Sequence, residues 1–98
     1  MNSNETPRSR LHLLLHLFIQ ERIDAETFCK RFEHTYNLEL NKDDLSDTER
    51  FAFSELFNKV VWFSPFPEER ARIPNYIGEE EVKAAVNRAL SLLGSDAS

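Results

Sequence analysis

The chain has 98 residues and a formal net charge of −5 at pH 7, with 41% hydrophobic and 30% charged residues. This length favours a single domain over residues 1–98, and the apolar share excludes a chain that is disordered throughout. Seventeen acidic against twelve basic residues disfavour nucleic acid as a partner, because a phosphate backbone repels carboxylates.

The first predicted helix begins at Pro7, with the Thr6 hydroxyl as its N-cap. Leucines and a phenylalanine follow at helical spacing, and Leu13 and Leu17 widen the apolar stripe. We therefore expect a helix that is mostly buried. Residues 1–5 before it are polar and aperiodic, and we expect them to be frayed.

The apolar run over residues 11–19 is only about half the length of a membrane span, and two histidines interrupt it. It lacks the small-residue cleavage site of a secretory signal. The lone Cys29 cannot form an internal disulfide, and we expect it to be a buried apolar residue in a reducing compartment. These features predict a cytoplasmic protein with no membrane among its partners.

Asp24 is the predicted N-cap of a second helix over residues 25–36, and Asn37 is expected to end that helix in the left-handed conformation. A polar connection follows. Ser46 and Glu49 then match a capping box, in which each side chain bonds the backbone N–H of the other, and predict the start of a third helix.

The third helix is expected to stop near Phe63, because Pro65 disfavours helical geometry at the residue before it. Three prolines close together then predict a loop. The last helix carries apolar residues at i, i+3, i+4, i+7, i+8 and i+11 from Val82, and Gly94 is expected to close it. Residues 95–98 are expected to be frayed.

No segment alternates with period two, no Asn-Gly or Asp-Gly turn occurs, and the chain has only two glycines. Strands therefore have little support in the sequence. Four amphipathic helices must bury their apolar faces, and short connections make sequential neighbours antiparallel. The prediction is an all-α fold, a small antiparallel four-helix bundle.

The sequence lacks a glycine-rich phosphate loop, a His-Glu-x-x-His motif, a Gly-x-Ser-x-Gly motif and paired cysteines. We therefore expect no catalytic activity, no cofactor and no metal. His12 and His16 have the spacing of a metal-binding pair, but leucines surround them and no third ligand is tied to them by sequence. A metal-dependent enzyme is a distant third interpretation, which metal analysis would test.

Acidic residues gather in residues 41–98, which hold eleven acids against seven bases. Acids that begin helices, such as Asp47, Glu49, Glu79 and Glu80, are typical of residues that complement the helix dipole and face solvent. An interface role remains open for them. An acidic surface of this kind favours a cationic partner.

Glu68 and Glu69 lie in the proline-bounded segment, where no helix start accounts for them unless a short turn forms. Trp62 falls off the apolar stripe of the third helix, so it either packs under the connection or anchors an interface. Phe63 is expected to pack in the core. The carboxylates and the tryptophan together predict a protein-binding surface.

One segment resembles the small colicin-D-type immunity proteins, and the likeness covers the chain from about Glu55 to Leu93. The family's pattern is an aromatic helix end, a proline-acid turn, and a Tyr-Ile pair before an acidic, valine-rich helix. The residues that match it are Glu55-Leu56-Phe57, Phe63-Ser64-Pro65-Phe66-Pro67-Glu68-Glu69-Arg70, Tyr76-Ile77 and residues 78–93.

The resemblance implies a helical bundle that binds a basic, tRNA-cleaving toxin domain and places carboxylates where the phosphates of the substrate lie. The family's acids near the end of the third helix fall on Val61 and Ser64 here, which implies a different toxin. The predicted contacts with the toxin are Glu68 and Glu69 first, Glu55 and Trp62 second, and Glu79 and Glu80 third.

These observations predict a cytoplasmic immunity protein, a monomer or weak homodimer, that occludes the basic active site of a nuclease toxin. The alternative is an acidic helical adaptor, whose carboxylates only solubilise it and whose apolar groove binds a partner helix. Strong salt dependence of association favours the first. Indifference to salt with a large negative heat-capacity change favours the second.

Overall fold

The computed structural model describes residues 6–97, with side chains described through Gly94. This part of the chain is helical and contains no strand, which confirms the all-α prediction. The elements in chain order are α1 (Pro7–Ile19), α2 (Ala25–His34), a π-helical turn η1 (Thr35–Glu39), a 3-10 turn η2 (Lys42–Asp44), α3 (Asp47–Val60), α4 (Pro67–Arg72) and α5 (Glu79–Ala97).

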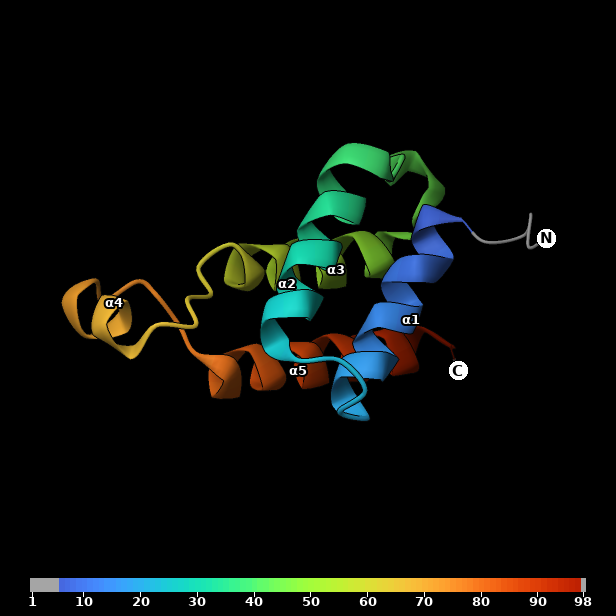
Figure 1. Cartoon of the computed structure of the whole chain (residues 1–98). Coiled ribbons are helices and arrows are strands. Elements are labelled where there is room, and N and C mark those ends of the chain that lie inside the picture. Colours follow the sequence, from blue (N-terminus) through green and yellow to red (C-terminus); the bar gives the residue numbers. More distant parts are fainter. Residues whose placement is uncertain (1–5, 98) are drawn as a thin grey trace.

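Four helices form the body of the molecule as two pairs (Figure 1). Helix α1 packs against α2, and α3 lies alongside α5. Figure 1 shows the first pair crossing the second, with α4 projecting from the end of the body that lies away from α1. The structure therefore does not confirm the predicted antiparallel four-helix bundle, because the two pairs of helices cross one another.

The core lies between the two helix pairs, and its largest fully buried side chains are four phenylalanines. Phe28 of α2 stacks on Phe18 of α1 with ring centroids 4.8 Å apart, and Phe32 meets Phe53 of α3 edge-on at 6.1 Å. Each of these four rings is at most 1% exposed. Helix α5 contributes smaller buried side chains, which are Val82, Val86 and Ala89.

Two predictions about burial have opposite outcomes. Cys29 is buried, as predicted, and burial together with the nearby Glu33 carboxylate raises the pKa of its thiol to about 12. The thiol therefore stays protonated at neutral pH. Leu13, in contrast, is 49% exposed, so the prediction of a mostly buried first helix is wrong on this face of α1. Here Leu13 lines an open groove between α1 and α2.

The predicted helix starts are confirmed, because each depends on residues close in sequence. Thr6 and Ser46 each accept a hydrogen bond from the backbone N–H three residues on, at 3.1 Å. Asp24 accepts one in the same way at 2.8 Å. All three satisfy N–H groups that the first turn of a helix leaves without a partner.

The predicted end of the second helix is wrong. Asn37 lies inside η1, which is closed by a hydrogen bond from the Leu40 N–H to the Thr35 carbonyl at 2.8 Å. Among non-glycine residues 6–97 the left-handed conformation belongs to Glu21, with φ of 62°. Glu21 follows α1, where the Arg22 N–H bonds the Leu17 carbonyl at 2.8 Å, as in a Schellman motif.

The prediction that Gly94 closes the last helix is also wrong, because α5 continues through it to Ala97. A Cβ at Gly94 would meet nothing within 4 Å, and no proline follows. Only the weak helix propensity of glycine, about 1 kcal/mol, opposes the helix there. Residues 95–97 are thus helical rather than frayed, while residues 1–5 and Ser98 lie outside the described residues.

The proline-rich segment is not a plain loop, because it contains the short helix α4. Pro67 occupies the first turn, where its missing N–H removes no helical hydrogen bond. Glu68 and Glu69 also fall in this turn and complement the helix dipole. A helix start therefore accounts for both acids, which the sequence alone left open.

Candidate functional site

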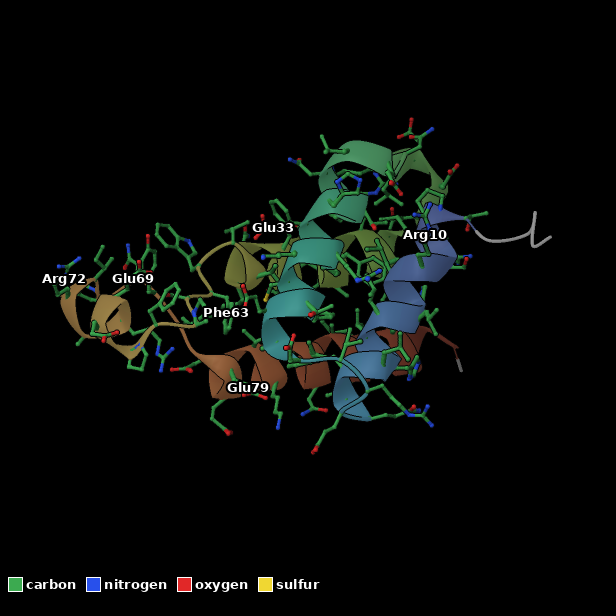
Figure 2. The ribbon with its side chains drawn as sticks, viewed as in Figure 1. Arg10, Glu33, Phe63, Glu69, Arg72 and Glu79 are labelled. Atoms are coloured by element: carbon green, nitrogen blue, oxygen red, sulfur yellow. The ribbon has the colours of Figure 1, made fainter. Side chains whose placement is uncertain are left out.

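Residues 61–77, which we call the lobe, leave the body after α3 and return to it before α5 (Figure 2). Two backbone hydrogen bonds close its neck. The Ile77 N–H donates to the Trp62 carbonyl at 2.9 Å, and the Ser64 N–H donates to the Ile77 carbonyl at 3.0 Å. Phe63 packs against the core, as predicted, so the base of the lobe is anchored in the body.

Ser64 is only 3% exposed, and its hydrogen bonds hold the lobe together from within. Its hydroxyl donates to Glu69 Oε1 at 2.7 Å and accepts from the Phe66 N–H at 3.2 Å. Its carbonyl accepts from Arg70 Nη1 at 2.6 Å. The Arg70 side chain also lies against Gly78, where a Cβ would be 3.2 Å from Arg70 Nε. The lobe is therefore held in shape by its own polar contacts.

We expect the substitution Ser64→Ala to loosen the lobe without unfolding the body. It leaves the Phe66 N–H and the Glu69 carboxylate without their hydroxyl partner, which costs about 1–2 kcal/mol. Amide hydrogen exchange within α4 should speed up while exchange in the core stays unchanged. The matched control is Ser91→Ala on the exposed face of α5. Unchanged exchange in α4 would contradict this role of Ser64.

The lobe exposes apolar side chains of a size that a folded chain usually buries. Val61, Trp62, Phe66 and Ile73 are between 38% and 56% exposed. The rings of Trp62 and Tyr76 lie 5.9 Å apart at the base of the lobe. Exposed aromatic and aliphatic groups gathered on one projection are typical of protein interfaces.

The structure brings five of the six predicted contact residues to the lobe and its neck. Glu68 is exposed on α4 and makes no ion pair within residues 6–94. Glu69, on the same helix, turns toward Ser64. Glu79 and Glu80 begin α5 directly after the neck, and Figure 2 shows Glu79 at the start of that helix, below Phe63.

Glu55 is the predicted contact that the structure keeps apart from the others. It lies on α3, outside the lobe, and accepts a hydrogen bond from Arg88 Nε of α5 at 2.9 Å. Both side chains are more than one-third exposed, at 40% for Glu55 and 63% for Arg88. Glu55 therefore joins α3 to α5 across a shallow cavity between these helices.

A cleft of about 290 Å³ opens where the lobe meets the body, and we call it the neck cleft. Its charged residues come from three elements, and Phe63 and Pro65 lie between them. The charged groups are Asp24, which is the N-cap of α2, Glu26 of α2, Arg70 of the lobe and Glu79 of α5. Sequence reasoning missed the two acids of α2, because nothing local links them to the lobe.

Of the three carboxylates in the neck cleft, Asp24 is held as the N-cap of α2, whereas Glu26 and Glu79 are held only weakly by other groups. Hydrogen bonds from the Thr27 side chain and then from its backbone N–H lower the pKa of Asp24. Glu26 lies 3.2 Å from Lys30, and Glu79 lies 3.8 Å from Lys83. Such exposed pairs contribute little free energy. A cation from a partner can therefore compete for the Glu26 and Glu79 carboxylates.

Glu49 forms a separate, buried cluster. It is 4% exposed, so the expectation that this first-turn acid faces solvent is wrong. Arg8 Nη2 lies 2.6 Å and His12 Nε2 2.8 Å from its carboxylate, and the Ser46 N–H donates at 2.9 Å. Burial alone would raise the pKa of Glu49, but these hydrogen bonds outweigh it and lower the pKa to about 2.

The same cluster accounts for His12 without a metal. Its ring contacts Glu49 and meets Phe53 edge-on, with centroids 5.3 Å apart. His16 is exposed on α1 and takes no part in the cluster. In the part of the chain with described side chains, no three histidine, cysteine or acidic residues come together as metal ligands. The cluster fastens α1 to the start of α3.

Comparison with known proteins finds no family model, no curated protein and no solved structure that matches the chain. The resemblance to colicin-D-type immunity proteins thus rests on the residues quoted above and stays a prediction. Of the helices described between residues 6 and 97, none has the length and apolar content to cross a membrane. The lobe and neck cleft together expose aromatic rings and carboxylates next to one another.

Proposed function

We propose that the chain is a cytoplasmic immunity protein that binds and neutralises a cognate nuclease toxin, most simply one that cleaves tRNA. The observation that carries the proposal is the braced lobe, which exposes Trp62, Phe66 and Glu68 beside an acidic cleft. The acidic balance of the chain supports a basic partner. The chain acts by occlusion and needs no chemistry, cofactor or metal of its own.

In this proposal the lobe and its neck contribute differently to binding, because they differ in charge. Glu68 and Glu69 are balanced by Arg70 and Arg72, so the lobe alone has no net charge. Arg70 is held within the neck by Ser64, which leaves Glu68 free at the surface. The acids of α2 and α5 supply the negative potential at the neck.

In this mechanism the lobe enters the active-site cleft of the toxin. Glu68 occupies the place of a substrate phosphate and pairs with lysine or arginine there. Glu79 and Glu80 meet cations at the rim of the cleft, and Trp62 with Tyr76 excludes water from the contact. Because the lobe is already braced, little conformational entropy is lost on binding.

The test is inhibition of the toxin itself. The probe is a basic, tRNA-cleaving toxin domain, to be sought at the C-terminus of an exported protein encoded next to this chain, with tRNA as its substrate. We expect cleavage to stop at about one equivalent of the chain, as in tight one-to-one binding. Cleavage that continues at about tenfold excess of the chain would refute the proposal. Raising the salt from about 50 to 500 mM should slow association, which separates this mechanism from groove binding.

A further inference from the structure

A groove of about 390 Å³ lies between α1 and α2, and the core leaves it open. Leu13 is 49% exposed at its edge, and Leu14, 8% exposed, forms part of its floor. Two arginines stand among its apolar residues. The full lining is Arg10, Leu13, Leu14, Leu17, Ile23, Arg31 and Thr35.

The charge of this groove opposes that of the chain. Its lining holds two cations and no carboxylate, although the chain as a whole carries a net charge of −5. Arg31 is exposed and makes no ion pair with another residue whose side chain is described. Arg10 bonds Glu39 at 2.5 Å, with both side chains about one-third exposed, at 36% and 32%. Arg31 is therefore the cation most available to a partner.

We propose that this α1–α2 groove binds a helical segment of a partner protein that carries leucine-type side chains flanked by carboxylates. Arg10 and Leu17 lie two helical turns apart, about 10 Å along α1. A partner helix with apolar residues at i, i+3 and i+7 presents those residues over the same length. The apolar residues bury themselves against Leu13 and Leu17, and the carboxylates pair with Arg31.

The groove is separate from the lobe, because α1 and α4 lie at opposite ends of the molecule (Figure 1). Both sites can therefore be occupied together, and this inference does not rest on the proposed toxin contact. A second copy of the chain is a poorer occupant. Its α4 carries Arg70 and Arg72 beside Glu68 and Glu69, so it lacks the unbalanced carboxylates that would pair with Arg31.

The probe is a fluorescein-labelled, helix-forming peptide of about 18 residues, with leucine at i, i+3 and i+7 and glutamate on both flanks. Fluorescence anisotropy measures its binding to the whole chain. The groove variant is L13E/R31E. The matched control is L38E/R22E, which makes the same changes at Leu38, 71% exposed, and at the exposed Arg22, neither of which lines the groove.

We expect micromolar binding by the unaltered chain and by L38E/R22E, and at least about 10-fold weaker binding by L13E/R31E. The milder variant R31Q should weaken binding about threefold, which keeps the test valid if the double variant does not fold. A peptide with lysine in place of glutamate should bind at least about 10-fold more weakly.

Three outcomes would overturn the inference. The first is no binding of the peptide to the unaltered chain at about millimolar concentration. The second is equal weakening in the groove variant and its matched control. The third is sedimentation that shows a dimer which L13E/R31E converts to a monomer, because that result would assign the groove to a second copy.

Discussion

Replacing Glu68 and Glu79 together by lysine is expected to slow association with the toxin domain by about 100-fold at low salt. Glu68 is the exposed acid of the lobe, and Glu79 lines the neck cleft. The change turns attraction into repulsion at both points. Stopped-flow fluorescence of Trp62 measures the rate, and the difference should shrink as salt screens the charges.

The matched control combines Asp43→Lys in η2 with Asp47→Lys at the start of α3, and both positions lie outside the lobe. Within residues 6–94 the Asp43 carboxylate makes no ion pair, like that of Glu68. Asp47 lies 3.8 Å from Arg50, as Glu79 does from Lys83. The net charge therefore changes equally in both variants. We expect the control to slow association only a few-fold. Equal slowing by the two variants would show that association depends on the overall charge of the chain and not on the surface formed by the lobe and the neck cleft.

Acid is expected to destabilise the chain through Glu49, whose pKa is lowered from its usual 4.5 to about 2. Between pH 4.5 and about pH 2 the Glu49 carboxyl group is protonated in the unfolded chain but ionised in the folded chain. Stability from this group is therefore fully present above about pH 5 and is lost as the pH falls toward 2. The loss amounts to about 3 kcal/mol.

The variant Glu49→Gln tests this account by urea unfolding at several pH values. Glutamine cannot ionise, so the variant should be about 3 kcal/mol less stable than the original chain near pH 7 and nearly equal to it near pH 2. The control Glu80→Gln, at an exposed position, should change little at either pH. A deficit for Glu49→Gln that stays constant with pH would contradict the lowered pKa.

Local signals made the helix starts predictable. The hydroxyls of Thr6 and Ser46 and the carboxylate of Asp24 bond N–H groups only three residues away, so the sequence contains both partners. The burial of Glu49, in contrast, could not be predicted from local sequence. Its capping box could be read, but Arg8 lies 41 residues earlier in the chain, and only the packing of α1 on α3 brings the two together.

Helix ends and surfaces were less predictable, because they depend on contacts far apart in sequence. Gly94 continues α5, since nothing in its surroundings stops the helix. The lobe was predicted as a proline-rich loop with an interface role, but its brace through Ser64 could not be foreseen. The neck cleft joins acids of α2 and α5, and the exposure of Leu13 depends on how α2 packs.

A crystal structure of the chain bound to the toxin domain tests the central claim most directly. The account predicts that the lobe enters the active-site cleft, with Trp62 in contact and Glu68 paired to a lysine or arginine of the toxin. Glu79 should meet a cation at the rim. A complex in which the lobe points into solvent, with the toxin seated elsewhere on the chain, would contradict it.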